Sequence, residues 1–145
     1  IIRGCGPVGY PGAAEVVNMQ PPDRLLKKGI NALPTLGDGR QSGTSESPSI
    51  LHVSPESAVG GDLAIIRNGD NMCIDLNKRR VDLLISKAEF IKRRKKKKIL
   101  KLNNQTPWQE ISRSNVGQLE DGACIRSRSL YMDIAKKKGI PRNNH

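Results

Sequence analysis

The chain has 145 residues, a formal net charge of +11, one Trp, one Phe and two Tyr. This length supports one modest domain, whose core must consist mainly of Ile, Leu, Val and Ala. No stretch approaches the roughly 18 apolar residues of a transmembrane helix, so no membrane partner is expected. Three scattered cysteines without a CxxC pair argue against a disulfide framework and for a reducing compartment, and we expect each to be a buried small apolar residue.

The first third of the chain is predicted to be rich in loops. Gly and Pro dominate residues 1–22, a short helix is expected over 24–28 and ends at Gly29, and residues 30–36 are expected to form a strand. A short apolar run follows at 50–53. Residues 54–58 indicate a turn or a single helical turn, closed by Gly60.

The middle and end of the chain predict strands and then helices. Three strands, over 62–67, 71–76 and 80–85, are expected to form an antiparallel meander, since Asn68-Gly69 suits a tight turn between the first two. Helices are expected from Lys87, from Pro107 to about 116, and over 130–138 before Gly139. The fold class is therefore α+β.

The positive charge is concentrated in one tract, Lys92–Lys98, which contributes seven of the 25 Lys and Arg. Residues 95–98 lack an apolar stripe, so we expect them to be solvated. A basic module that binds RNA or another anion through this tract is an alternative function. Few aromatic residues are present to stack on bases, which makes nucleic acid the less favoured partner.

Two glycine-rich loops carry the chemistry. The first runs over 4–12 and leads to Glu15, and the second, over 37–45, contains Ser42. Glycine has no Cβ, so its backbone amides can approach a ligand closely. Each loop also delivers one reactive side chain, and together the loops suggest part of an active site.

The order of these motifs resembles one family, the IlvD/Edd dehydratases, in its C-terminal part. The blocks that carry the resemblance are Gly6-Pro7, Gly9-Tyr10-Pro11-Gly12, Glu15, Asp38 to Thr44, His52 to Glu56, Gly60 to Ala64 and Asn77 to Leu83. The tail, with Thr106-Pro107-Trp108-Gln109-Glu110 and Gly139-Ile140-Pro141-Arg142, resembles the aldonate branch, typified by arabinonate and xylonate dehydratases. Counted with residues 6–15 as one block, these are five ordered blocks, and together they are much more specific than any one of them.

The resemblance implies an Mg²⁺-dependent hydro-lyase with a [2Fe–2S] cluster, which converts a 2,3-dihydroxy acid such as a sugar acid or dihydroxyisovalerate to a 2-keto acid. It implies a β-barrel-like domain with flanking helices over 1–102 and a helical C-terminal extension over 103–145. The cluster ligands would lie in an N-terminal α/β domain upstream of this chain. A cytoplasmic homo-oligomer is expected, or a mitochondrial one for a eukaryotic dihydroxy-acid dehydratase.

The resemblance also assigns roles to individual residues. Glu15 matches a Mg²⁺ ligand, Ser42 the catalytic base, and Gly43 and Thr44 lie beside the substrate, as would the terminal His145. His52 is expected to be structural. The chain departs from the family in reading Gly12-Ala13-Ala14-Glu15 for Gly-Met-Pro-Glu, and also at Gln41 and Gly37. We expect the isolated chain to be inactive, and a degenerate fragment remains the third alternative.

Overall fold

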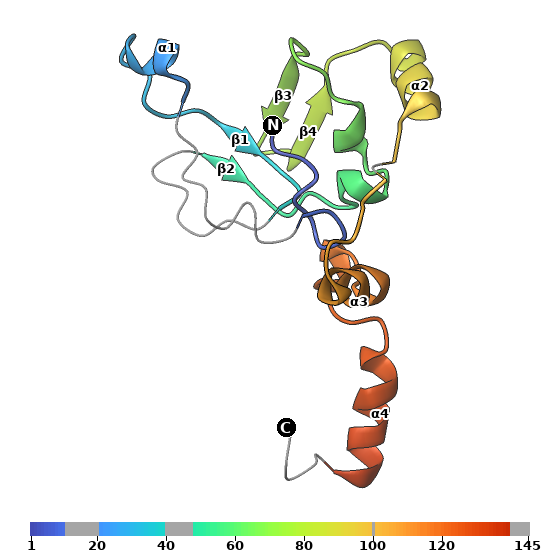
Figure 1. Ribbon diagram of the computed structural model, residues 1–145. Helices are drawn as coiled ribbons and strands as arrows, with labels where there is room; N and C mark the ends of the chain where they lie inside the picture. Colours follow the sequence, from blue (N-terminus) through green and yellow to red (C-terminus); the bar gives the residue numbers. More distant parts are fainter. Residues whose placement is uncertain (11–20, 40–47, 100, 140–145) are drawn as a thin grey trace.

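The computed structural model describes residues 1–10, 21–39, 48–99 and 101–139 (Figure 1). Within these ranges the protein combines helices with two small sheets, which confirms the α+β class. A body formed by the sheets, α1 (Asp23–Leu26) and α2 (Lys87–Lys96) lies above α3 (Pro107–Asn115), and α4 (Arg128–Lys138) projects away from it. Short 3-10 helices are η1 (Ser57–Val59), η2 (Asp62–Ile65) and η3 (Leu119–Asp121).

The first sheet brings the N-terminus beside the start of the second loop. Strands β1 (Thr35–Leu36) and β2 (Ser49–Ile50) pair in parallel, so only the last two residues of the predicted strand over 30–36 are extended in a sheet. An isolated parallel bridge joins Ile2 to Gly37, and the amide of Ile2 donates to the carbonyl of Leu36 at 2.9 Å. The first loop therefore begins next to the residue at which the second begins.

The second sheet is a hairpin of β3 (Met72–Asp75) and β4 (Arg80–Leu83), paired antiparallel. The prediction of a first strand of this meander, over 62–67, is wrong, because most of that segment forms η2. The side chain of Arg3 donates hydrogen bonds to the carbonyls of Leu63, Ala64 and Ile66 at 3.0, 3.1 and 2.8 Å. Carbonyls bonded to a guanidinium no longer need a partner strand.

Helices α2 and α3 begin where their capping residues predict, whereas α4 begins at Arg128, two residues before the predicted start, without a side-chain cap. Ser86 caps α2 by accepting from the amide of Glu89 at 3.2 Å, and Thr106 caps α3 by accepting from the amide of Gln109 at 3.2 Å. Helix α4 ends at Gly139, whose φ of 77° is accessible to glycine at little cost. Gly60, with φ of 93°, ends η1 in the same way.

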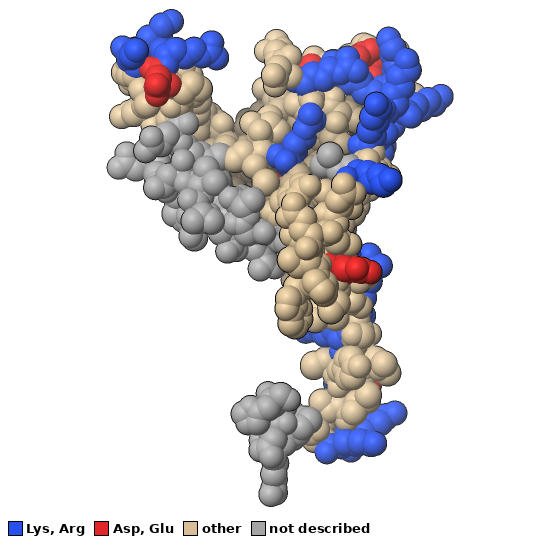
Figure 2. Space-filling view, viewed as in Figure 1, with Lys and Arg blue, Asp and Glu red and all other residues tan. Residues whose placement is uncertain are grey.

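The basic tract at the end of α2 is partly used to attach the helix to the body. Arg93, whose side chain is 10% exposed, contacts Asp70 at 2.6 Å and Glu89 at 2.8 Å. Arg94 pairs with Asp62 at 3.0 Å, and the ammonium of Lys97 donates to the carbonyl of Gly60. The expectation that residues 95–98 are solvated is therefore wrong for Lys97, although Figure 2 shows other basic side chains exposed around α2.

The core is small. Its buried apolar residues, within the part of the chain that the structure describes, are Leu36, Ala58, Leu63 and Ile65. The described strands form two separate pairs without a closed barrel, so the barrel stays a prediction. Among the described helices, none combines the length and apolarity needed to cross a bilayer.

The cysteines are less buried than predicted. Cys73 is exposed, and Cys5 and Cys124 are half-buried free thiols. Met72 lines a pocket under the hairpin, and successive side chains of a strand point to opposite faces. Cys73 therefore points to the solvent side of β3.

Candidate functional site

The residues predicted to do the chemistry lie outside the described residues. Glu15 belongs to 11–20, Ser42, Gly43 and Thr44 to 40–47, and His145 to 140–145. Their placement stays a prediction. The structure describes instead the base from which both loops emerge, and this base is held by two buried carboxylates.

Asp38 joins the start of the first loop to η1. Its side chain is fully buried and accepts four hydrogen bonds from residues that the structure describes. The amides of Gly4 and Cys5 donate to it, both at 3.1 Å, and Ser57 donates its amide at 2.8 Å and its hydroxyl at 2.6 Å. Asp38 lies four residues before Ser42, so this cluster holds the start of the second loop next to the start of the first loop.

Glu56 holds the middle of the first loop. Its side chain is also fully buried. The amide of Val8 donates to Oε1 at 2.8 Å, and the amide of Gly9 donates to Oε2 at 2.9 Å. Gln118, from the segment after α3, donates to Oε1 at 2.9 Å and accepts from the amide of Glu56 at 3.0 Å.

The first loop fits closely on the Glu56 side chain. A Cβ at Gly6 would lie 2.3 Å from Oε2 of Glu56, and a Cβ at Gly9 would lie 2.3 Å from the carbonyl oxygen of Gly4. Both distances are too short for real atoms. Glycine is therefore required at these two positions by close approach, in addition to any ligand that the loop contacts.

Helix α3 binds the first loop through Arg113. Its guanidinium donates to the carbonyls of Val8 at 3.1 Å and Gly9 at 3.0 Å, and it lies over the ring of Tyr10, 5.2 Å from the centroid. Val8 and Gly9 thus have their amides bound by Glu56 and their carbonyls bound by Arg113. The C-terminal helical segment contributes directly to the geometry of the loop that leads to Glu15.

Cys5 lies in the same loop. Burial raises the pKa of its thiol, and the negative charge of Asp38 raises that pKa further. A raised pKa disfavours the thiolate, which is the form that binds metals and attacks substrates. In the part of the chain that the structure describes, no group of three or more His, Cys, Asp or Glu is arranged to hold a metal ion.

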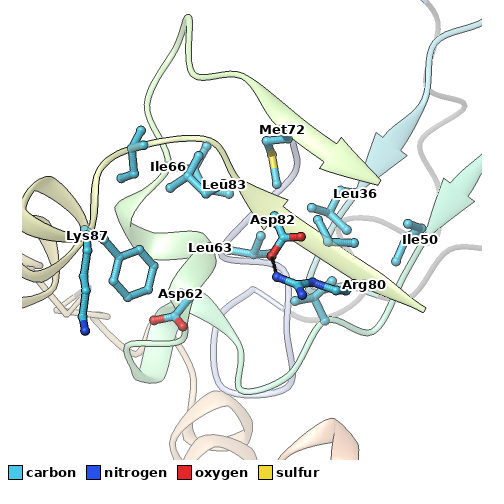
Figure 3. A pocket seen from close by; sticks show the side chains of 14 residues that line it. Leu36, Ile50, Asp62, Leu63, Ile66, Met72, Arg80, Asp82, Leu83 and Lys87 are labelled. Carbon is cyan, nitrogen blue, oxygen red and sulfur yellow. Dashed lines mark hydrogen bonds and ion pairs between the residues drawn. The ribbon is translucent and has the colours of Figure 1, made fainter. Parts of the chain in front are cut away.

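The hairpin covers a separate open pocket of about 710 Å³ (Figure 3). Its walls are mainly apolar, with Leu36, Leu63, Met72 and Leu83 among them. Arg80 and Asp82 cross one wall as an ion pair at 2.6 Å, and this hydrogen bond lowers the pKa of Asp82. Such walls suit apolar side chains better than a polyhydroxylated acid.

Sequence reasoning overlooked the residues that build the loop base, which are Asp38, Glu56, Arg113 and Gln118. Asp38 and Glu56 belong to motifs that carry the family resemblance, and the motifs alone do not show that the two acids are buried. One signal is present in the sequence, because glycine-rich loops contain many amides that need acceptors. Asp38 lies within such a loop, and Glu56 lies three residues after the short apolar run at 50–53. Nothing local could link Arg113 or Gln118 to residues more than 60 positions away.

Comparison with known proteins agrees with these motifs. The family described as "Dihydroxy-acid/6-phosphogluconate dehydratase C-terminal" matches residues 1–123. A D-xylonate dehydratase of Caulobacter vibrioides is 54% identical over 145 residues, which are all of this chain and 24% of that protein. An L-arabinonate dehydratase of Rhizobium leguminosarum is 48% identical over 93 residues, which are 64% of this chain and 16% of that protein.

A more distant relative also matches most of the chain. A dihydroxy-acid dehydratase of Thermodesulfovibrio yellowstonii is 38% identical over 133 residues, which are 86% of this chain and 22% of that protein. The chain thus spans about a quarter or less of the length of these relatives. It belongs to the dihydroxy-acid/6-phosphogluconate dehydratase family, of which it represents the C-terminal region.

Proposed function

We propose that this chain is the C-terminal part of a sugar-acid dehydratase, which removes water from a 2,3-dihydroxy acid and yields a 2-keto acid. The observation that carries the proposal is the match to a D-xylonate dehydratase. The match extends over the full length of this chain, with 54% identity. The dihydroxy-acid dehydratases match less closely, at 38% for the relative from Thermodesulfovibrio. A sugar acid is therefore the proposed substrate class.

In the proposed reaction, Ser42 acts as the base. Its oxygen takes the proton from C2, the electron pair forms the C2=C3 bond, and the hydroxyl on C3 leaves as water once it is protonated. The enol then becomes the 2-keto acid by moving its hydroxyl proton to C3. Serine is a weak base in water, so the amides of Gly43 and Thr44 would have to stabilise its anionic form, and His145 would contact the substrate.

The cofactors are proposals as well. Glu15 offers the carboxylate oxygen that Mg²⁺ prefers, and Mg²⁺ would stabilise negative charge on the substrate. The ligands of the [2Fe–2S] cluster would lie in the N-terminal domain of a longer protein. A barrel completed by other parts of that protein, and a homo-oligomeric full-length enzyme, belong to the same proposal.

The base of the loops supports this reading. Asp38, which lies four residues before Ser42, binds the first loop. Glu56 binds Gly9, which lies six residues before Glu15. Both loops therefore start from one hydrogen-bonded cluster, as expected if the side chains of Glu15 and Ser42 act on a single substrate. The apolar pocket under the hairpin is not part of the proposed site.

The experiment is a chimera of the Caulobacter D-xylonate dehydratase in which the matching C-terminal quarter is replaced by this chain. Under anaerobic conditions, with iron, sulfide and Mg²⁺ supplied, we expect 2-keto acid to form from D-xylonate. L-arabinonate and dihydroxyisovalerate, tested in parallel, define the substrate class. A folded chimera that forms no 2-keto acid from any of the three would contradict the proposal, and the unaltered relative serves as the positive control.

A further inference from the structure

We propose that Glu56 is a positioning residue for the first glycine loop, and that Gln118 orients its carboxylate. This inference rests on the proposed function and adds a residue that touches neither substrate nor metal. It assigns part of the catalytic geometry to the segment after α3.

The two carboxylate oxygens of Glu56 serve two different amides. Oε1 accepts from Val8 and Oε2 accepts from Gly9, at 2.8 and 2.9 Å. An amide side chain of the same shape has one acceptor oxygen and one NH₂ group. Whichever way a glutamine at this position turned, one of the two loop amides would face a donor instead of an acceptor.

Gln118 determines how the carboxylate is turned. It binds both the side chain and the backbone amide of Glu56, at 2.9 and 3.0 Å. These two contacts orient the carboxylate, because the side chain of Gln118 holds both the backbone amide and the Oε1 atom of Glu56. The direction of the bonds from the loop amides then depends on the orientation of this carboxylate. The loop lies directly against Glu56, because Gly6 and Gly9 have no Cβ.

The loop has little freedom to absorb a change at Glu56. Arg113 holds the carbonyls of Val8 and Gly9 from the opposite side, at 3.1 and 3.0 Å. If one hydrogen bond to Glu56 were lost, the peptide planes at Val8 and Gly9 would tilt, because Arg113 still holds their carbonyls. The change would extend along the chain toward Glu15. Small displacements of positioned groups reduce catalysis strongly, by as much as 10²-fold for about 1 Å.

The first test is amide hydrogen exchange on the full chain carrying Glu56→Gln. We expect the amides within residues 4–10 to exchange at least about tenfold faster than in the unsubstituted chain, because one of them has lost its acceptor. Glu110→Gln, an exposed position on α3, is the matched control and should change nothing in that segment. Unchanged exchange over 4–10 in Glu56→Gln would overturn the inference.

The second test uses the chimera with the Caulobacter enzyme. Glu56→Gln should lower kcat by roughly 10²-fold. Ile65→Val, which shortens a buried apolar side chain and removes no hydrogen bond, controls for lost stability and should keep kcat within about twofold. Equal kcat values for the two variants would overturn the positioning role. An inactive unsubstituted chimera would count against the proposed function instead, and the exchange experiment would still decide this inference.

Discussion

At the scale of single residues, the protein uses carboxylates where loops present several amides at once. Asp38 accepts bonds from three residues and is fully buried. An ionised carboxylate offers only acceptor sites, so it can satisfy a cluster of donors that no neutral side chain of this size could satisfy. Its sequence neighbours Gly37 and Gly39 gave no indication of burial, because the donors come from residues 4, 5 and 57.

Asp38→Asn should therefore destabilise the chain without changing its volume. One oxygen would become an NH₂ group facing amide donors, and leaving such buried groups unpaired costs about 1–3 kcal/mol. Chemical denaturation measures this loss as a lower midpoint. Asp121→Asn, at an exposed position in η3, should leave the midpoint nearly unchanged. Equal midpoints for both variants would show that the Asp38 cluster contributes nothing to stability.

At the scale of elements, features fixed by neighbouring residues could be predicted, and features fixed by distant residues could not. Ser86 and Thr106 cap their helices as their sequences indicate, since a cap needs only the next three residues. Residues 62–67 read as a strand, yet Arg3 binds their carbonyls from about 60 positions away. The prediction of a hairpin is confirmed by β3 and β4, but the strand predicted before it, over 62–67, is wrong.

The attachment of α2 predicts a dependence of stability on pH. The hydrogen bond from Arg93 holds the pKa of Asp70 below its ordinary value. The unfolded chain then binds more protons than the folded chain as the pH falls, so this contribution is complete above about pH 4 and is lost below it. Asp70→Asn should flatten the fall of the denaturation midpoint below pH 4.

The comparison needs a carboxylate control. Asp23→Asn, at an exposed position on α1, should leave the pH profile of the midpoint unchanged. A profile for Asp70→Asn that runs parallel to that of the unsubstituted chain through pH 3–5 would contradict the role assigned to the pair with Arg93.

At the scale of the whole molecule, much apolar surface faces solvent. Trp108 is 78% exposed, and the pocket under the hairpin is open. Helix α4 projects from the body (Figure 1), and its Leu130 and Tyr131 are exposed. Large exposed apolar surfaces commonly mark contacts with other protein. The chain spans 24% of the Caulobacter relative, and the remaining part of such a protein is the proposed cover.

We therefore expect the isolated chain to form no 2-keto acid from D-xylonate, L-arabinonate or dihydroxyisovalerate. In the proposed enzyme, the cluster ligands and the Mg²⁺ ligands other than Glu15 would lie in the N-terminal domain of a longer protein. The assay is anaerobic, with iron, sulfide and Mg²⁺ present, and the chimera serves as the active control. Steady product formation by the isolated chain would contradict the proposed division of the active site.

Ser42 is the proposed base that removes the C2 proton of a sugar acid, and one substitution tests this role most directly. In the chimera, Ser42→Ala should lower kcat for D-xylonate by about 10²–10⁴-fold, the usual effect of losing a general base. Ser45→Ala, three residues along the same loop, should keep kcat within about threefold of the unsubstituted chimera. An Ser42→Ala chimera that retains the kcat of its Ser45→Ala counterpart would contradict the account.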